Sequence, residues 1–138
     1  MKITIIGSFR KYYEQICSLI DVFHKNGIEV LSPQKSYICN EVDGFVILNS
    51  DCNGEPVIIQ EHVFTNIRNS DCVYVWNPLG YLGNSTCYEI GKIIEMKKTI
   101  FFKEKPIDLP IQTDASMIMD ANELVNYLTK DDIGGCNE

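Results

Sequence analysis

Residues 70–92, S-D-C-V-Y-V-W-N-P-L-G-Y-L-G-N-S-T-C-Y-E-I-G-K, contain a strand, a loop and a helix in one stretch. The run C-V-Y-V-W at 72–76 is apolar and rich in β-branched and aromatic side chains, which predicts a buried strand. Residues 77–85 hold two glycines and a proline, as expected of a loop. Residues 85–96 carry apolar side chains at helical spacing, with Ser85 or Thr86 as the expected N-cap. A strand followed directly by a helix is the repeating unit of an α/β protein.

The same alternation extends over the whole chain. Strands are expected at 2–6, 28–31, 72–76, 99–102 and 116–119, and helices at 12–26, 60–69, 85–96 and 120–130. This order predicts a doubly wound, flavodoxin- or Rossmann-like parallel sheet of about five strands, with helices on both faces. Residues 36–57, with a short strand at 45–48, are expected to form an insertion or hairpin over one end of the sheet. We assign residues 1–132 to a single domain and residues 133–138 to a flexible tail.

Composition restricts the class of partner. The net charge of −7 argues against a nucleic acid polymer, which needs a basic surface. The six cysteines form no C-x-x-C pair and there are only two histidines, so neither a metal site nor a cofactor is expected. No apolar run is long enough for a signal peptide or a membrane span, so we expect no membrane partner and a reducing, cytoplasmic location.

Ligands of doubly wound sheets bind beyond the carboxyl ends of the strands, which directs attention to the loops there. Gly7-Ser8-Phe9-Arg10 leaves the first strand and enters the first helix. Gly7 allows a tight turn, Ser8 supplies a hydroxyl and Arg10 a positive charge, which together suit a phosphate. An ordinary strand–helix turn with a surface arginine fits the pattern equally well. A dinucleotide fingerprint is excluded, because G-x-G-x-x-G is absent.

The loop at 77–85, N-P-L-G-Y-L-G-N-S, is long for its position, and long loops tend to be functional. Gly80 and Gly83 permit a positive φ and close approach of the backbone to a ligand. The remaining candidates for ligand contact are Tyr81, whose ring can stack, and Asn84 and Ser85 at the helix start. A structural loop with capping residues has the same composition.

One acid, Glu89, lies about one turn inside the helix that follows this loop. A partly desolvated carboxylate at that point can act as a nucleophile or a general base. The pattern alone slightly favours a simpler role, in which Glu89 only complements the positive end of the helix dipole. His62, on the preceding helix, is by pattern alone more often a structural histidine than a catalytic one.

Together these motifs resemble the nucleoside 2-deoxyribosyltransferase superfamily, which includes 2'-deoxynucleoside 5'-monophosphate N-glycosidases. Residues 7–10 are similar to the family's G-S-x-R opening, and N-S-D at 69–71 is similar to its strand entry. S-T-C-Y-E-I-G at 85–91 resembles its helix with a Glu-Ile/Leu-Gly core. The resemblance covers most of the chain, with the insertion at 36–57 matching least. It implies a small-molecule nucleoside or nucleotide as ligand and a homodimer or larger homo-oligomer.

The resemblance also assigns roles to residues. It implies that Glu89 attacks the anomeric carbon, expels the base and leaves a glycosyl-enzyme ester that water or a second base resolves. It implies further that Ser8, Arg10 and Ser85 hold a 5'-phosphate. The expected activity is therefore cleavage or transfer of an N-glycosidic bond.

Two aspartates of the family pattern are missing. One falls at Val63, beside His62, whose imidazolium can take over protonation of the leaving base. The other, six residues before Glu89, falls at Gly83, which favours hydrolysis over transfer. The alternative is a non-catalytic nucleotide-binding or sensing protein of the same fold. A phosphoribohydrolase is a third possibility, although G-N-S-T-C-Y-E at 83–89 matches that family's G-G-x-G-T-x-x-E loop only in part.

Overall fold

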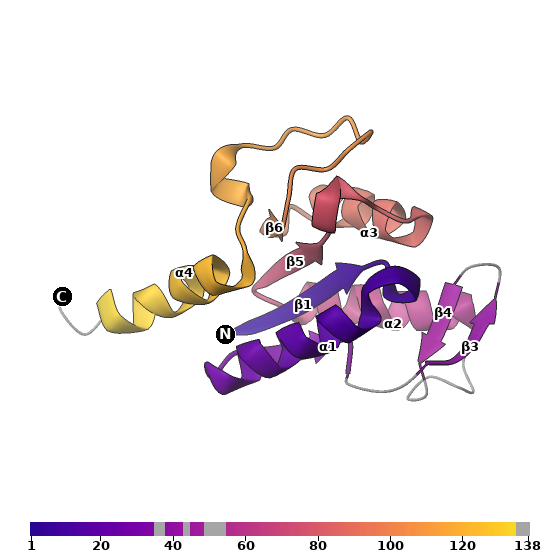
Figure 1. Cartoon of the computed structure of the whole chain (residues 1–138), viewed down its shortest axis with the longest axis horizontal. Coiled ribbons are helices and arrows are strands. Elements are labelled where there is room, and N and C mark those ends of the chain that lie inside the picture. The colour runs from indigo at the N-terminus through magenta and orange to yellow at the C-terminus, as the bar shows by residue number, and fades with distance from the viewer. Residues whose placement is uncertain (35–37, 43–44, 49–54, 135–138) are drawn as a thin grey trace.

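The structure, a computed structural model, describes residues 1–34, 38–42, 45–48 and 55–134. Its central sheet has four parallel strands in the order β2-β1-β5-β6. The strands are β1 (Lys2–Gly7), β2 (Glu29–Ser32), β5 (Cys72–Trp76) and β6 (Ile100–Phe102). The helices are α1 (Phe9–Lys25), α2 (Pro56–Asn69), α3 (Asn84–Glu95) and α4 (Ala121–Gly134) (Figure 1). The predicted α/β fold with a parallel, Rossmann-like sheet is confirmed, with four strands in place of about five.

The two faces of the sheet are covered by different helices, because side chains alternate along each strand. Ile3, Ile5 and Tyr74 point to the face on which α1 and α4 pack. Val73 and Val75 point to the other face, on which α2 and α3 pack. The chain turns outward in opposite directions from β1 and β5, so the switch point of the topology lies between these two strands.

The prediction of a fifth strand at 116–119 is wrong. Residues Ala115–Met117 form a 3₁₀ helix instead, and Ile118 makes a single parallel bridge to Phe102. The reason is local: the Asp114 carboxylate accepts a hydrogen bond from the Ser116 backbone N–H at 2.9 Å, which commits that residue to a turn.

The insertion contains the expected hairpin. Strands β3 (Ile38–Val42) and β4 (Phe45–Leu48) pair antiparallel in a sheet of their own, and β4 contacts α1. The rest of the predicted insertion, at 36–37, 43–44 and 49–54, lies outside the described residues.

Every helix differs from its predicted bounds. The first begins at Phe9, just after β1, and not at residue 12. The second helix begins at Pro56 and not at residue 60, because proline is well suited to the first turn of a helix. The third begins at Asn84 with Gly83 as its N-cap, so the predicted serine or threonine cap is wrong. Helix α4 runs to Gly134, so the first two residues of the expected tail are helical, and residues 135–138 lie outside the described part. None of the described helices is both long and apolar enough to cross a membrane.

Candidate functional site

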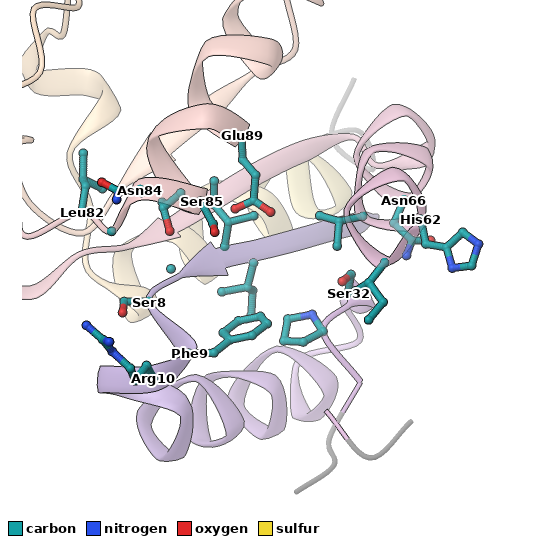
Figure 2. Close-up of a pocket in the computed structure, with 18 of the residues that line it drawn as sticks. Ser8, Phe9, Arg10, Ser32, His62, Asn66, Leu82, Asn84, Ser85 and Glu89 are labelled. Carbon is teal, nitrogen blue, oxygen red and sulfur yellow. The ribbon is translucent and has the colours of Figure 1, made fainter. Parts of the chain in front are cut away.

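A pocket of about 840 Å³ opens at the carboxyl ends of β1 and β2. It is walled by the start of α1, one side of α2, and the loop and first turns of α3 (Figure 2). This is the place at which a doubly wound sheet binds its ligands, and the volume lies in the range of small-molecule sites. The fold therefore supplies a pocket at the position that the topology predicts.

Gly80, which is expected to allow close approach of the backbone to a ligand, does not line this pocket, but all nine residues expected to bind or act on the ligand do. They are Gly7, Ser8, Arg10, His62, Tyr81, Gly83, Asn84, Ser85 and Glu89. Residues 82 positions apart in the chain come together because β1 leads into α1 at the same edge of the sheet at which β5 leads into α3. The structure thus brings the predicted residues into one place, and their chemical roles remain predictions.

Two helix N-termini meet at one end of the pocket. Helix α1 has Ser8 as its N-cap and α3 has Gly83, and neither cap makes a side-chain hydrogen bond. A Cβ atom on Gly83 would lie 3.8 Å from Ser8 Oγ, so the two helix starts face each other closely. The first N–H groups of both helices lack intrahelical partners, and both dipoles present their positive ends. This end of the pocket is therefore suited to an anion.

Polar side chains add to this anion-binding end. Figure 2 shows Ser8, Arg10, Asn84 and Ser85 gathered there, with Glu89 further along the pocket. Within the described part of the chain, the hydroxyls of Ser8 and Ser85 form no hydrogen bond, so both remain able to bind a ligand oxygen. A phosphate would meet backbone N–H groups, two hydroxyls and the Arg10 guanidinium together.

Glu89 is a buried carboxylate on the wall of the pocket. Its side chain is only 8% exposed, and it shares the buried face of α3 with Thr86, Ile90 and Ile93. Burial raises the pKa of Glu89 from 4.5 to about 7, and a hydrogen bond from Gln60 opposes that rise. A glutamate that only complemented the helix dipole would lie in solvent, so its burial disfavours the simpler role.

Gln60 is the contact that sequence reasoning missed. Its Nε2 donates a hydrogen bond of 2.8 Å to Glu89 Oε2, and the Gln60 side chain is also only 8% exposed. A signal was present in the sequence, because Gln60 occupies the same helical stripe as the buried Phe64 and Ile67. A glutamine on an apolar stripe needs a buried polar partner.

His62 lines the pocket from α2, but its side chain is exposed. Figure 2 shows its ring pointing away from Glu89. To act on a leaving base the ring must turn inward. Exposed side chains change rotamer on the picosecond to nanosecond scale, so this turn is fast.

The glycines act differently from the prediction at two positions. Gly7 was expected to permit a tight turn, but it is required by sheet packing, since a Cβ there would lie 2.8 Å from the Trp76 carbonyl oxygen. Gly80 has the expected positive φ of +80°. Gly83 has φ −79°, so the expectation of a positive φ there is wrong. Its lack of a side chain instead leaves room beside Ser8.

The loop before α3 is tied to the segment after β6. Asn77 is fully buried, and its side chain donates to the Glu104 carbonyl at 2.8 Å and accepts from the Glu104 N–H at 3.0 Å. The Ile107 N–H donates to the Gly80 carbonyl at 3.1 Å. These bonds hold the loop in place, so the pocket wall that it forms is fixed before a ligand arrives.

Tyr81 is held on the pocket wall by its neighbours. The Lys11 ammonium lies 4.1 Å from the centre of its ring, and Tyr12 contacts the ring edge to face at 6.3 Å between centroids. Together with Phe9 it gives the pocket aromatic surface that suits a planar base. Within the described ranges, no cluster of three or more His, Cys, Asp or Glu side chains is placed to hold a metal ion.

Comparison of the chain with protein-family models, with curated proteins and with solved structures gave no match.

Proposed function

We propose that this protein cleaves or transfers the N-glycosidic bond of a nucleoside or nucleoside 5'-monophosphate, with Glu89 as the nucleophile. One observation carries the proposal: a buried carboxylate lies in the same pocket as two uncapped helix N-termini and an arginine. A nucleotide needs both parts, an anion site for the phosphate and a nucleophile at a fixed distance from it.

The chemistry follows from the position of Glu89. An N-glycosidic bond breaks through an oxocarbenium-like transition state, and a nearby carboxylate stabilises that cation and then bonds to it. The resulting glycosyl ester is resolved by water, which gives hydrolysis, or by a second base, which gives transfer. Attack requires the anionic form of Glu89, so a pKa of about 7 makes activity rise with pH through the neutral range.

The 5'-phosphate would bind at the anion-binding end. Ser8, Arg10 and Ser85 supply hydroxyls and a guanidinium, and the starts of α1 and α3 supply backbone N–H groups. The base would then lie toward His62, which we propose as the acid that protonates it. The resemblance to the superfamily also leads us to propose a homo-oligomer, which light scattering on the purified protein tests.

The test is release of free base from a panel of nucleosides and nucleoside 5'-monophosphates, followed by chromatography. Wild type should release base, and Glu89→Gln should lower the rate by about a thousandfold or more, since it removes the nucleophile. Glu95→Gln is the matched control, because Glu95 is an exposed acid at the end of the same helix. Equal activity of the Glu89→Gln variant and wild type would exclude the mechanism.

A second function, nucleotide binding without turnover, is favoured by one observation: the His62 ring points away from Glu89. Such a protein would use the anion-binding end and the aromatic wall but lack the acid. It would be stabilised against heat by a nucleotide and would release no base over hours. Base release by wild type would exclude this function.

A further inference from the structure

The contact between Gln60 and Glu89 divides the two carboxylate oxygens into different environments. Oε2 accepts the amide hydrogen bond from Gln60 at 2.8 Å. Oε1 has no hydrogen-bond partner within the described part of the chain. No buried side-chain oxygen or nitrogen of that part lacks a partner, so Oε1 must reach the surface of the pocket.

We propose that Gln60 is a positioning residue, whose amide fixes the Glu89 carboxylate so that Oε1 attacks the sugar while Oε2 becomes the carbonyl oxygen of the ester. This inference rests on the proposed function. It is carried by the burial of both side chains and by the direct bond between them, which a rotation of Glu89 would break. Breaking that bond would leave a buried amide and a buried carboxylate oxygen without partners.

Both chemical steps balance with this assignment. In the first, Oε1 forms a bond to the anomeric carbon, and the N-glycosidic bond breaks with its electron pair leaving on the base. In the second, a water oxygen bonds to the anomeric carbon and the bond to Oε1 breaks, returning its electron pair to the carboxylate. The proton that the water loses passes to solvent. Gln60 touches neither the sugar nor the base in this scheme.

The hydrogen bond from the Gln60 amide stabilises the free carboxylate and the glycosyl ester of Glu89 to different extents. A hydrogen bond to an ionised oxygen is about twice as strong as one to a neutral oxygen, so Gln60 stabilises the carboxylate more than the ester. It therefore keeps Glu89 ionised before attack and helps it leave in the second step. Without it, Glu89 would ionise at higher pH and the ester would break down more slowly.

Other groups that face Glu89 do not duplicate this role. The other titratable side chains that line the pocket are Arg10 from α1, His62 from α2 and Tyr81 from the loop before α3. Within the described part of the chain, none of these three side chains donates a hydrogen bond to Glu89. Arg10 lies at the anion-binding end, and the His62 ring points away, so neither holds Oε2 (Figure 2).

The experiment measures kcat/KM against pH, with intact-mass spectrometry during turnover. Gln60→Met has nearly the same length and lacks the donor. It should move the acid limb of the profile up by about one to two pH units, the worth of a hydrogen bond to a charged group. Gln60→Glu, which has the same shape and sets a second carboxyl beside Glu89, should move the limb further still. Gln112→Met makes the same chemical change at an exposed position and should leave the profile unchanged.

Two results separate positioning from a merely structural role. At high pH the Gln60→Met variant should recover the part of kcat/KM that was lost to protonation of Glu89, and the remaining deficit measures the loss of positioning. A merely distorted pocket would lower kcat/KM by the same factor at every pH. The Gln60→Met variant should also accumulate the sugar adduct to a higher fraction than wild type. The inference would be overturned if the acid limb of the pH profile stayed in place in the folded Gln60→Met and Gln60→Glu variants and Gln60→Met accumulated no more sugar adduct than wild type. The proposed function would then still stand. Absence of base release by wild type would overturn the proposed function itself.

Discussion

A Cβ atom on Gly7 would lie 2.8 Å from the carbonyl oxygen of Trp76, its partner in the pairing of β1 with β5. Side chains do not approach a backbone oxygen so closely, so an alanine would force the two strands apart where the anion-binding end begins. We expect Gly7→Ala to lower the free energy of unfolding by about 1 to 3 kcal/mol, as overpacking usually does. Urea denaturation measures this.

Gly91→Ala is the matched control for that change. Gly91 is an exposed glycine within α3, and a Cβ atom there would meet nothing within 4 Å. Alanine is the better helix former, so this variant should be more stable than wild type by about 0.5 to 1 kcal/mol. Equal losses in both variants would show that the contact with Trp76 does not decide the outcome.

Burial of Glu89 should make the stability of the protein depend on pH. Its pKa is about 7 in the folded protein and 4.5 without burial. Between these values the folded state keeps a proton that the unfolded chain has released, so stability falls as pH rises through this window. Glu89→Gln removes the ionisation. The free energy of unfolding of this variant should exceed that of wild type by under about 1 kcal/mol at pH 5 and by about 3 kcal/mol at pH 8.

Glu95→Gln controls for the loss of one negative charge. The Glu95 side chain is exposed, so the stability of the Glu95→Gln variant should stay within about 0.5 kcal/mol of wild type at both pH values. A Glu89→Gln variant with the same flat response would show that Glu89 is not desolvated. A stability gain from removing a buried charge is typical of residues kept for function.

Local patterns were sufficient to predict most elements of the sheet. The strand predicted at 72–76 is β5 unchanged, because an apolar β-branched run between turn residues has few other stable placements. The prediction of a strand at 116–119 was wrong because the Asp114 side chain bonds to the backbone of Ser116. The spacing of apolar residues carries no information on such a contact. The loops that line the pocket were found because strand ends converge in this topology, which follows from the order of the elements. His62 and Glu89 lie inside helices, and the resemblance to a known family was needed to favour a catalytic role for them.

Contacts between distant residues could not be predicted in the same way. The need for glycine at position 7 depends on the register that sets it against Trp76. The role of Gln60 depends on the angle at which α2 and α3 pack, which brings two side chains from separate helices to 2.8 Å. The direction of the His62 ring depends on a rotamer, and no sequence pattern reports a rotamer at an exposed position.

Arg10 should contribute to binding of a nucleoside 5'-monophosphate but not of the corresponding nucleoside. A charge-assisted hydrogen bond to phosphate contributes about 1.5 to 3 kcal/mol, so Arg10→Met should raise KM for the monophosphate about 10- to 100-fold. KM for the nucleoside should change little, because it has no phosphate to bind. Steady-state kinetics on the matched pair of substrates measures both.

Arg68→Met supplies the control for loss of an arginine. Arg68 is exposed in the last turn of α2 and does not line the pocket. The variant should keep both KM values within about twofold of wild type. If Arg10→Met weakened nucleoside and monophosphate equally, Arg10 would shape the pocket and not bind the phosphate.

His62 should matter only for bases that need a proton to leave. Its ring points away from Glu89, but it is exposed and able to turn toward the pocket that it lines. General-acid catalysis contributes about a hundredfold or more, so His62→Gln should slow release of an ordinary purine by about that factor. Release of 7-methylguanine from its nucleoside should change little, because that base is already cationic and leaves as a neutral molecule. His24→Gln, at the exposed end of α1, should slow neither substrate. Equal slowing of both substrates by His62→Gln would mean that His62 binds the base without protonating it, and no slowing of either would place His62 outside the reaction.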